Sequence, residues 1–125
     1  MIHITTDKKY LVLPIASESP RGGETVVSMS NVHKARNVIT IGKIKHGERI
    51  KFGDDLANTE YPMVLHTASC SVGSSGSALL NQNLEIVGIQ LGGNENILRR
   101  FISGMMMPSD RILEFLSESG YAIKE

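Results

Sequence analysis

One segment of the sequence combines a candidate nucleophile with an unusually free backbone. In Gly73-Ser74-Ser75-Gly76-Ser77 the hydroxyl-bearing residues stand between and beside glycines, and small apolar residues flank the segment. A serine that attacks a carbonyl needs backbone N–H groups directed at the oxygen that becomes negative, and flanking glycines permit the dihedral angles this requires. We therefore predict an acyl-transfer nucleophile at Ser75, with the backbone N–H groups of Gly73 and Ser75 as the donors of an oxyanion hole.

A loop rich in glycine and serine, which turns because its residues are small, is the competing interpretation of this segment. The segment does not match the Gly-x-Ser-x-Gly elbow of α/β-hydrolases, since Ser77 occupies the place of the second glycine. No alternation of strands and helices surrounds it either. The α/β-hydrolase fold is therefore disfavoured.

The sequence around this segment has an all-β pattern, in which short β-type runs alternate with turn residues. The runs are 10–13, 25–29, 37–41, 61–67, 77–80, 84–91 and 102–107, and the turn residues include Gly47-Glu48 and Gly92-Gly93-Asn94. After Pro108, Ser109 can cap an amphipathic helix that Gly120 is placed to end. The sequence predicts one domain over 1–125, with a β-barrel or sandwich over 8–108 and a helix over 109–119.

Composition argues against several classes of partner. Lysine plus arginine and aspartate plus glutamate each number 13, and no basic run suggests nucleic-acid binding. The apolar runs are too short to span a bilayer, and the N-terminus lacks the features of a signal peptide. The single cysteine, Cys70, favours a reducing intracellular compartment and lacks partners at metal-ligand spacing. We expect no nucleic acid, no membrane, no metal and no cofactor.

The nucleophile segment resembles the signature of the trypsin-like (chymotrypsin-fold) serine proteases. Gly-Ser-Ser-Gly-Ser, followed by Ala-Leu-Leu-Asn at 78–81 and Glu-Ile-Val-Gly-Ile at 85–89, is similar to Gly-x-Ser-Gly-Gly/Ser-Pro-Leu…Val-Gly-Ile. Upstream, 23–27 and 38–44 resemble the strand pair that opens the second barrel of that family. Downstream, 102–109 and the helix resemble its closing strand and final helix.

This resemblance covers nearly the whole chain, with its parts in the family's order. It implies the second six-stranded barrel of the chymotrypsin-like double-barrel fold with a C-terminal α-helix, and an N-terminal barrel that is largely missing. It also implies a serine-type endopeptidase that cleaves polypeptides through an acyl-enzyme at Ser75, with the oxyanion hole formed by the backbone of Gly73, Ser74 and Ser75.

The other two members of a catalytic triad are harder to find. The resemblance gives Asp7 the role of orienting the base, while an exposed aspartate in a turn is an equally good interpretation. In the family the base lies in the first barrel, and none of His3, His33, His46 and His66 matches its position. A serine without an adjacent base is a weak nucleophile, so the isolated chain should show little triad catalysis.

Three explanations for the missing barrel stay open. The chain is a truncated product, which we favour, or a second chain supplies the barrel and its histidine, or the protein is a degenerate remnant. The function is accordingly a serine endopeptidase lacking the triad histidine. The alternatives are a catalytically inactive, protease-like module that binds peptides and a structural β domain whose loop is only a turn.

The resemblance also implies where a substrate would bind. The P1 pocket, which receives the side chain before the cleaved bond, would be lined by Ser69, Cys70, Val72, Gln90, Leu91, Gly92 and Gly93, with Gly104 on the closing strand. Ser69 stands where a carboxylate would select arginine or lysine, so we expect cleavage after an apolar or medium-sized residue. For Gly92 and Gly93, an ordinary turn is an equally good interpretation.

Overall fold

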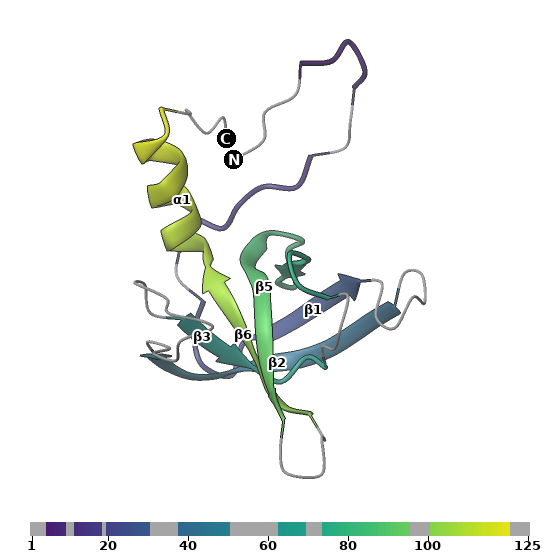
Figure 1. Cartoon of the computed structure of the whole chain (residues 1–125), viewed down its shortest axis with the longest axis vertical. Helices are drawn as coiled ribbons and strands as arrows, with labels where there is room; N and C mark the ends of the chain where they lie inside the picture. Colours follow the sequence, from purple (N-terminus) through teal and green to yellow (C-terminus); the bar gives the residue numbers. More distant parts are fainter. Residues whose placement is uncertain are drawn as a thin grey trace.

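The computed structural model describes residues 5–9, 12–18, 20–30, 38–50, 63–69, 74–95 and 101–120, with 46–50, 93–95 and 101–103 described by their backbone alone. Six antiparallel strands close into a barrel in the order β1-β2-β3-β6-β5-β4, and a helix follows (Figure 1). The elements are β1 (Thr25–Ser30), β2 (Val38–Ile50), β3 (Met63–His66), β4 (Ala78–Leu80), β5 (Ile86–Glu95), β6 (Phe101–Pro108) and α1 (Ser109–Glu118). The predicted six-stranded barrel with a C-terminal helix is confirmed.

Alternation of side chains along the strands creates the inside and the outside of the barrel. On β1, Val26 is buried, whereas Val27 is half-buried and Met29 is exposed. The antiparallel register pairs Val27 with Ile41 and Met29 with Ile39, so these four apolar side chains share the outer face.

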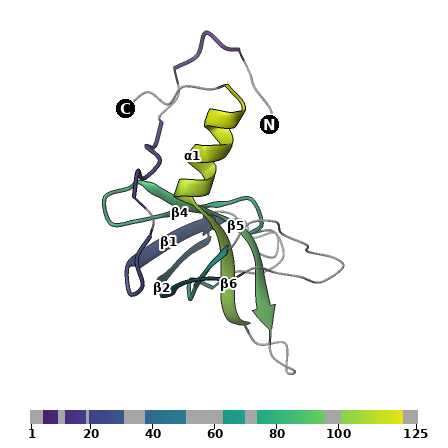
Figure 2. The ribbon, with the colours of Figure 1, turned by 90° about the vertical axis from the view of Figure 1, so that its left-hand side faces the viewer.

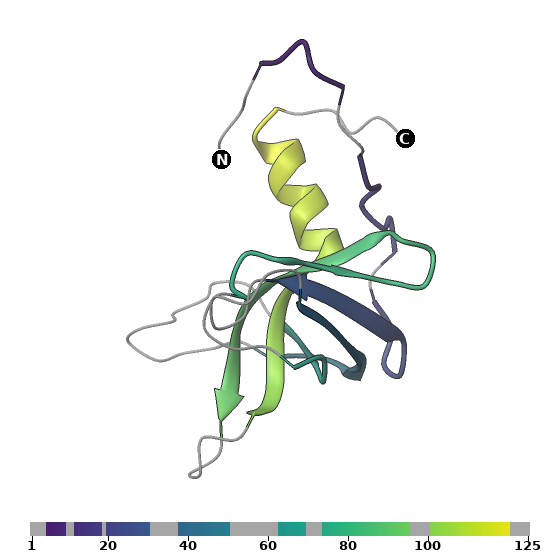
Figure 3. The ribbon, with the colours of Figure 1, turned by 90° about the vertical axis from the view of Figure 1, so that its right-hand side faces the viewer.

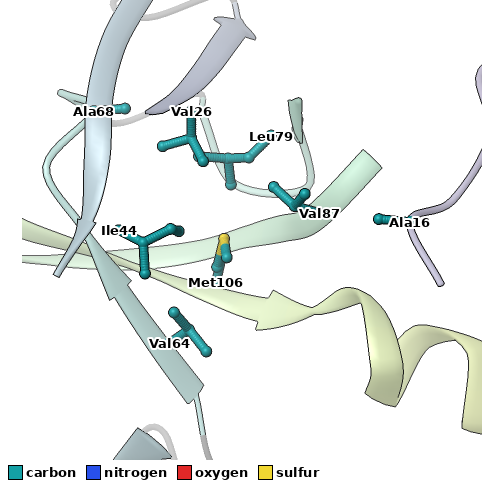
Figure 4. Close-up of a cluster of buried hydrophobic side chains, with 8 residues drawn as sticks. All are labelled: Ala16, Val26, Ile44, Val64, Ala68, Leu79, Val87 and Met106. Carbon is teal, nitrogen blue, oxygen red and sulfur yellow. The ribbon is translucent and has the colours of Figure 1, made fainter. Parts of the chain in front are cut away.

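The core lies at the centre of the barrel, where each strand contributes a buried apolar side chain (Figure 4). Its members are Ala16, Val26, Ile44, Val64, Ala68, Leu79, Val87 and Met106. Burying one of its valine, isoleucine, leucine or methionine side chains stabilises the fold by about 1.5–3 kcal/mol, so burial of apolar area favours closure of the barrel. Leu79 brings β4 into this core, directly after the predicted nucleophile segment.

The hairpin between β4 and β5 is organised by the side chain of Asn81. Its Oδ1 accepts hydrogen bonds from the backbone N–H groups of Asn83 at 2.9 Å and Glu85 at 3.0 Å. Leu84 has a positive φ of 59°, an uncommon conformation for a leucine, and its side chain is 61% exposed. The chain therefore turns between the predicted runs 77–80 and 84–91, but Leu84 belongs to the turn and not to the strand, which begins at Ile86.

Helix α1 continues directly from the end of β6 and stands away from the barrel (Figures 2 and 3). The expectation that Ser109 caps it is wrong, because Pro108 occupies the N-cap position and no side chain caps the helix. Ser109 instead donates a hydrogen bond of 3.2 Å to the carbonyl oxygen of Glu18. The first turn of α1 is thus tied to the N-terminal segment. No helix in the described part of the chain is long and apolar enough to cross a membrane.

Three expected boundaries differ from the structure. Val12 and Leu13, predicted as part of a strand over 10–13, are exposed and lie outside any strand, while Tyr10 falls outside the described residues. Gly47-Glu48 lies inside β2, where the pairing with β3 shifts register between Ile44 and Arg49, and such an irregularity lets a strand continue through turn-forming residues. Gly92-Gly93-Asn94 lies inside β5, so the interpretation of these glycines as an ordinary turn is wrong.

Candidate active site

Ser75 occupies the corner of a tight turn. The backbone N–H of Ser77 donates a hydrogen bond of 3.1 Å to the carbonyl oxygen of Ser74, and the hydroxyl of Ser77 donates to the same oxygen. Gly76, the third residue of the turn, has a φ of +86°, which a type II turn requires and which glycine adopts without strain. As a result Ser74 is buried and the hydroxyl of Ser75 is directed to the exposed surface.

Strand β5 holds this turn in place from one side. The N–H of Gly76 donates to the carbonyl oxygen of Gln90 at 2.7 Å, and the N–H of Gln90 donates to the carbonyl oxygen of Ser77 at 2.8 Å. The hydroxyl of Ser75 donates to the carbonyl oxygen of Leu91 at 3.3 Å. The structure therefore brings Ser75 together with Gln90 and Leu91, both of which the sequence analysis placed at a substrate site.

The remaining residues predicted before the nucleophile are partly described. Gly73, Cys70 and Val72 lie outside the described residues. Ser69 is exposed, and its carbonyl oxygen accepts a hydrogen bond of 2.9 Å from the hydroxyl of Thr40 on β2. The oxyanion hole at Gly73, Ser74 and Ser75 and the P1 pocket stay predictions.

The predicted substrate strand is β5, which includes Gln90, Leu91, Gly92 and Gly93. Its pairing with β6 shifts register between Gln90 and Gly92, and such a shift bends a strand and redirects its side chains. Leu91 is exposed beside the turn, whereas Gln90 is only 1% exposed. The amide Nε2 of Gln90 donates to the carbonyl oxygen of Gly92 at 2.6 Å.

His66 is the last residue of β3, which falls within the predicted β-type run 61–67 and precedes the nucleophile segment. Its ring is 0% exposed, and its Nε2 lies 2.5 Å from Oε1 of Gln90. Burial lowers the pKa of His66 below its ordinary value of 6.5, although the hydrogen bond with Gln90 opposes the shift. Burial therefore favours the neutral form of the ring.

The imidazole has room because its cross-strand partner on β6 is a glycine. His66 pairs with Gly104, and a Cβ added there would lie 2.3 Å from Cε1 and 2.4 Å from Nε2 of the ring. Sequence reasoning missed this pair, because no pattern links a histidine to a distant glycine until the register of β3 and β6 is known.

Asp7 lies apart from these residues. The segment 5–9 is exposed and runs clear of the barrel on the side of α1 (Figures 1 and 2). The N-terminal segment meets the barrel at Ile15, which bridges to Ile86 at the beginning of β5, whereas Ser75 contacts Leu91 further along. The proposed role of Asp7 in orienting a base stays a prediction. In the described ranges no group of three histidine, cysteine, aspartate or glutamate residues could hold a metal ion.

The closed six-stranded barrel is the arrangement that the resemblance implied, and its exposed Ser75 lies in a glycine turn that is hydrogen-bonded to β5. The model of the trypsin-like peptidase domain matches residues 2–89, and the chain belongs to this family. The predicted membership of the trypsin-like serine protease superfamily is confirmed.

Known relatives include serine proteases of the HTRA group. The chain is 30% identical over 118 residues to mitochondrial serine protease HTRA2 of Bos taurus, covering 92% of this chain and 24% of the relative. It is 32% identical over 120 residues to serine protease HTRA1 of Xenopus tropicalis, covering 95% of this chain and 25% of the relative. The chain thus spans about a quarter of the length of these relatives.

Solved structures agree on the fold. The active form of the Rv3671c protease from M. tuberculosis superimposes with a TM-score of 0.68 at 20% identity, covering 90% of this chain and 50% of that chain. The HtrA-type protease AlgW with a decapeptide superimposes with a TM-score of 0.70 at 19% identity, covering 85% of this chain and 32% of that chain. The matched part of each solved structure is therefore half or less of its chain.

Proposed function

We propose that this chain is the nucleophile-bearing part of a serine endopeptidase that cleaves polypeptides through an acyl-enzyme at Ser75. The Oγ of Ser75 attacks the peptide carbonyl carbon while a base takes its proton, and the C–N bond then breaks as that proton passes to the leaving amine. Water releases the acyl group in a second cycle of the same steps.

The exposed hydroxyl of Ser75, at the corner of a turn that β5 fixes through two backbone hydrogen bonds, is the observation that carries this proposal. A nucleophile gains most when its position is fixed before the substrate binds, because no ordering is then needed at the moment of reaction. The contact of Oγ with the Leu91 carbonyl oxygen is a resting contact, which attack on a substrate would replace.

The one histidine whose side chain the structure describes does not fit the role of the base. His66 is buried, and its Nε2 is committed to Gln90, so it cannot take a proton from an exposed hydroxyl. His3 and His33 fall outside the described residues, and of His46 only the backbone is described. We propose that a first barrel, in a longer product or in a second chain, supplies the histidine.

An apolar face beside the turn over 74–77, here called the nucleophile turn, is where such a barrel would pack. The outer side of β4, β1 and β2, here called the apolar face, consists of Val27, Met29, Ile39, Ile41, Ala78 and Leu80. Met29, Ile39 and Ile41 are 58%, 62% and 69% exposed, and Ala78 begins directly after the turn that carries Ser75. Contiguous apolar surface of this kind marks an interaction site. The greater length of the relatives supports a first barrel as its occupant.

Labelling with a fluorophosphonate probe tests the proposal. We expect little labelling of this chain alone, and strong labelling when a first barrel carrying a histidine is present. Labelling should vanish in Ser75→Ala and persist in Ser17→Ala, a matched loss of an exposed hydroxyl on the N-terminal segment. Absence of labelling from every version would contradict the endopeptidase and favour the inactive module that binds peptides.

A further inference from the structure

A short series of hydrogen bonds leads from His66 in the barrel core through Gln90 to the backbone of Gly92 on β5. The carbonyl oxygen of Gly92 can only accept, so the atom of Gln90 that faces it is the donating Nε2. Oε1 of Gln90 then faces His66, and because this oxygen can only accept, the imidazole must donate from Nε2. The geometry alone therefore fixes the orientation of the amide and the tautomer of the ring.

The other ring nitrogen has no such partner. Nδ1 of His66 is buried and makes no hydrogen bond within the described part of the chain. In the neutral ring it is an unprotonated acceptor, whose burial costs less than that of an unpaired charged donor. The lowered pKa of His66 agrees with this state of the ring.

Gln90 connects these hydrogen bonds to the nucleophile turn. Its carbonyl oxygen accepts from the N–H of Gly76, and its own N–H donates to the carbonyl oxygen of Ser77, so both of its backbone groups are bonded to the turn. The register shift at Gln90–Gly92 removes a regular ladder contact with β6 at this point. The side chain of Gln90 replaces that contact, because its amide donates a hydrogen bond to the carbonyl oxygen of Gly92 in the same strand.

We propose that His66 is a positioning residue for Ser75, because it fixes the side chain of Gln90, which in turn holds the bend of β5 against the nucleophile turn. The effect of His66 on catalysis at Ser75 rests on the proposed function, whereas its effect on the shape of the turn does not. His66 touches no reacting atom and acts through Gln90. Gly104 is the second requirement, since any larger residue there would displace the ring.

Amide hydrogen exchange tests the inference without relying on activity. The reporter is the amide of Gly76, which donates to Gln90, and the reference is the amide of Ile44, which donates to the carbonyl oxygen of Glu24 at 2.9 Å. In Gln90→Met and His66→Leu, which keep the volume but remove the hydrogen bonds, we expect Gly76 to lose about tenfold more protection than Ile44. Ser109→Ala, which removes a buried hydrogen bond at α1, should change both amides alike.

A conservative variant separates positioning from general loss of packing. In His66→Gln the amide nitrogen reaches the position of the imidazole Nε2, so the protection of Gly76 should return toward that of the original chain. The inference is overturned if Gly76 and Ile44 lose equal protection from exchange in Gln90→Met. It is also overturned if ¹⁵N spectra of the imidazole show that the ring carries its proton on Nδ1. If Gly76 responds as expected while no version reacts with fluorophosphonate, the positioning role stands and the endopeptidase fails.

Discussion

Replacing Gly104 with alanine should destabilise the barrel through one specific collision. The new Cβ would lie 2.3 Å from Cε1 and 2.4 Å from Nε2 of His66, whereas carbon atoms make favourable contact at about 3.5–4.0 Å. The ring would have to move by roughly 1 Å, and a displacement of that size breaks the hydrogen bond to Gln90. Overpacking costs about 1–3 kcal/mol and the loss of a buried hydrogen bond about 1–3 kcal/mol, so we expect a loss of roughly 2–6 kcal/mol.

A double-mutant cycle with His66→Ala makes this prediction sharp. Without the ring there is no collision, so Gly104→Ala in that background should cost less than about 1 kcal/mol. The free energy of unfolding is measured in urea by circular dichroism, because the chain has no tryptophan. If the Gly104→Ala variant alone does not fold, recovery of a cooperative unfolding transition in the double variant supports the same collision with His66. A cost that is equal in both backgrounds would refute the reasoning.

Three further predictions concern stability. The pKa of His66 is lowered in the folded state, so below pH 6.5 this histidine binds protons more readily in the unfolded chain. As the pH is lowered from 6.5 to the folded pKa, the free energy of unfolding should therefore fall by up to about 1.4 kcal/mol per pH unit. In urea titrations at a series of pH values His66→Gln should lack this part of the slope, and an unchanged slope would contradict a buried neutral ring. Leu84→Gly should stabilise by about 0.5–1 kcal/mol, since the positive φ suits glycine and the exposed leucine loses little packing, and a lower midpoint in urea would count against it. Leu79→Ala should cost about 2–5 kcal/mol in the same assay, and a cost below 1 kcal/mol would show that β4 is not held by the core.

The sequence predicted the strands well because their residues alternate and turn residues separate them. The runs 25–29, 77–80 and 102–107 fall within one or two residues of β1, β4 and β6. Gly47 and Gly92 were misread as turn residues, since a glycine that permits a register shift within a strand looks the same in sequence as a glycine in a loop.

The candidate site was predictable only in its local part. Ser75 stood out because the glycines around it are adjacent in sequence, and the structure places it in a glycine turn beside Gln90 and Leu91. The role of His66 depends on pairing with Gly104 and on contact with Gln90, which lie far along the chain. Such contacts are set by register, and a local pattern does not carry them.

Closure of the barrel also has a kinetic consequence for the nucleophile. Strand β4 is only three residues long and pairs with β1, which lies far before it in the sequence. Contacts between distant segments form slowly, because the loop entropy is lost before they stabilise anything. The turn that carries Ser75 is anchored between β4 and β5, so it should acquire its shape late, together with the last strand pairings. A nascent or partly folded chain would then expose its apolar strands before the turn around Ser75 takes its native shape.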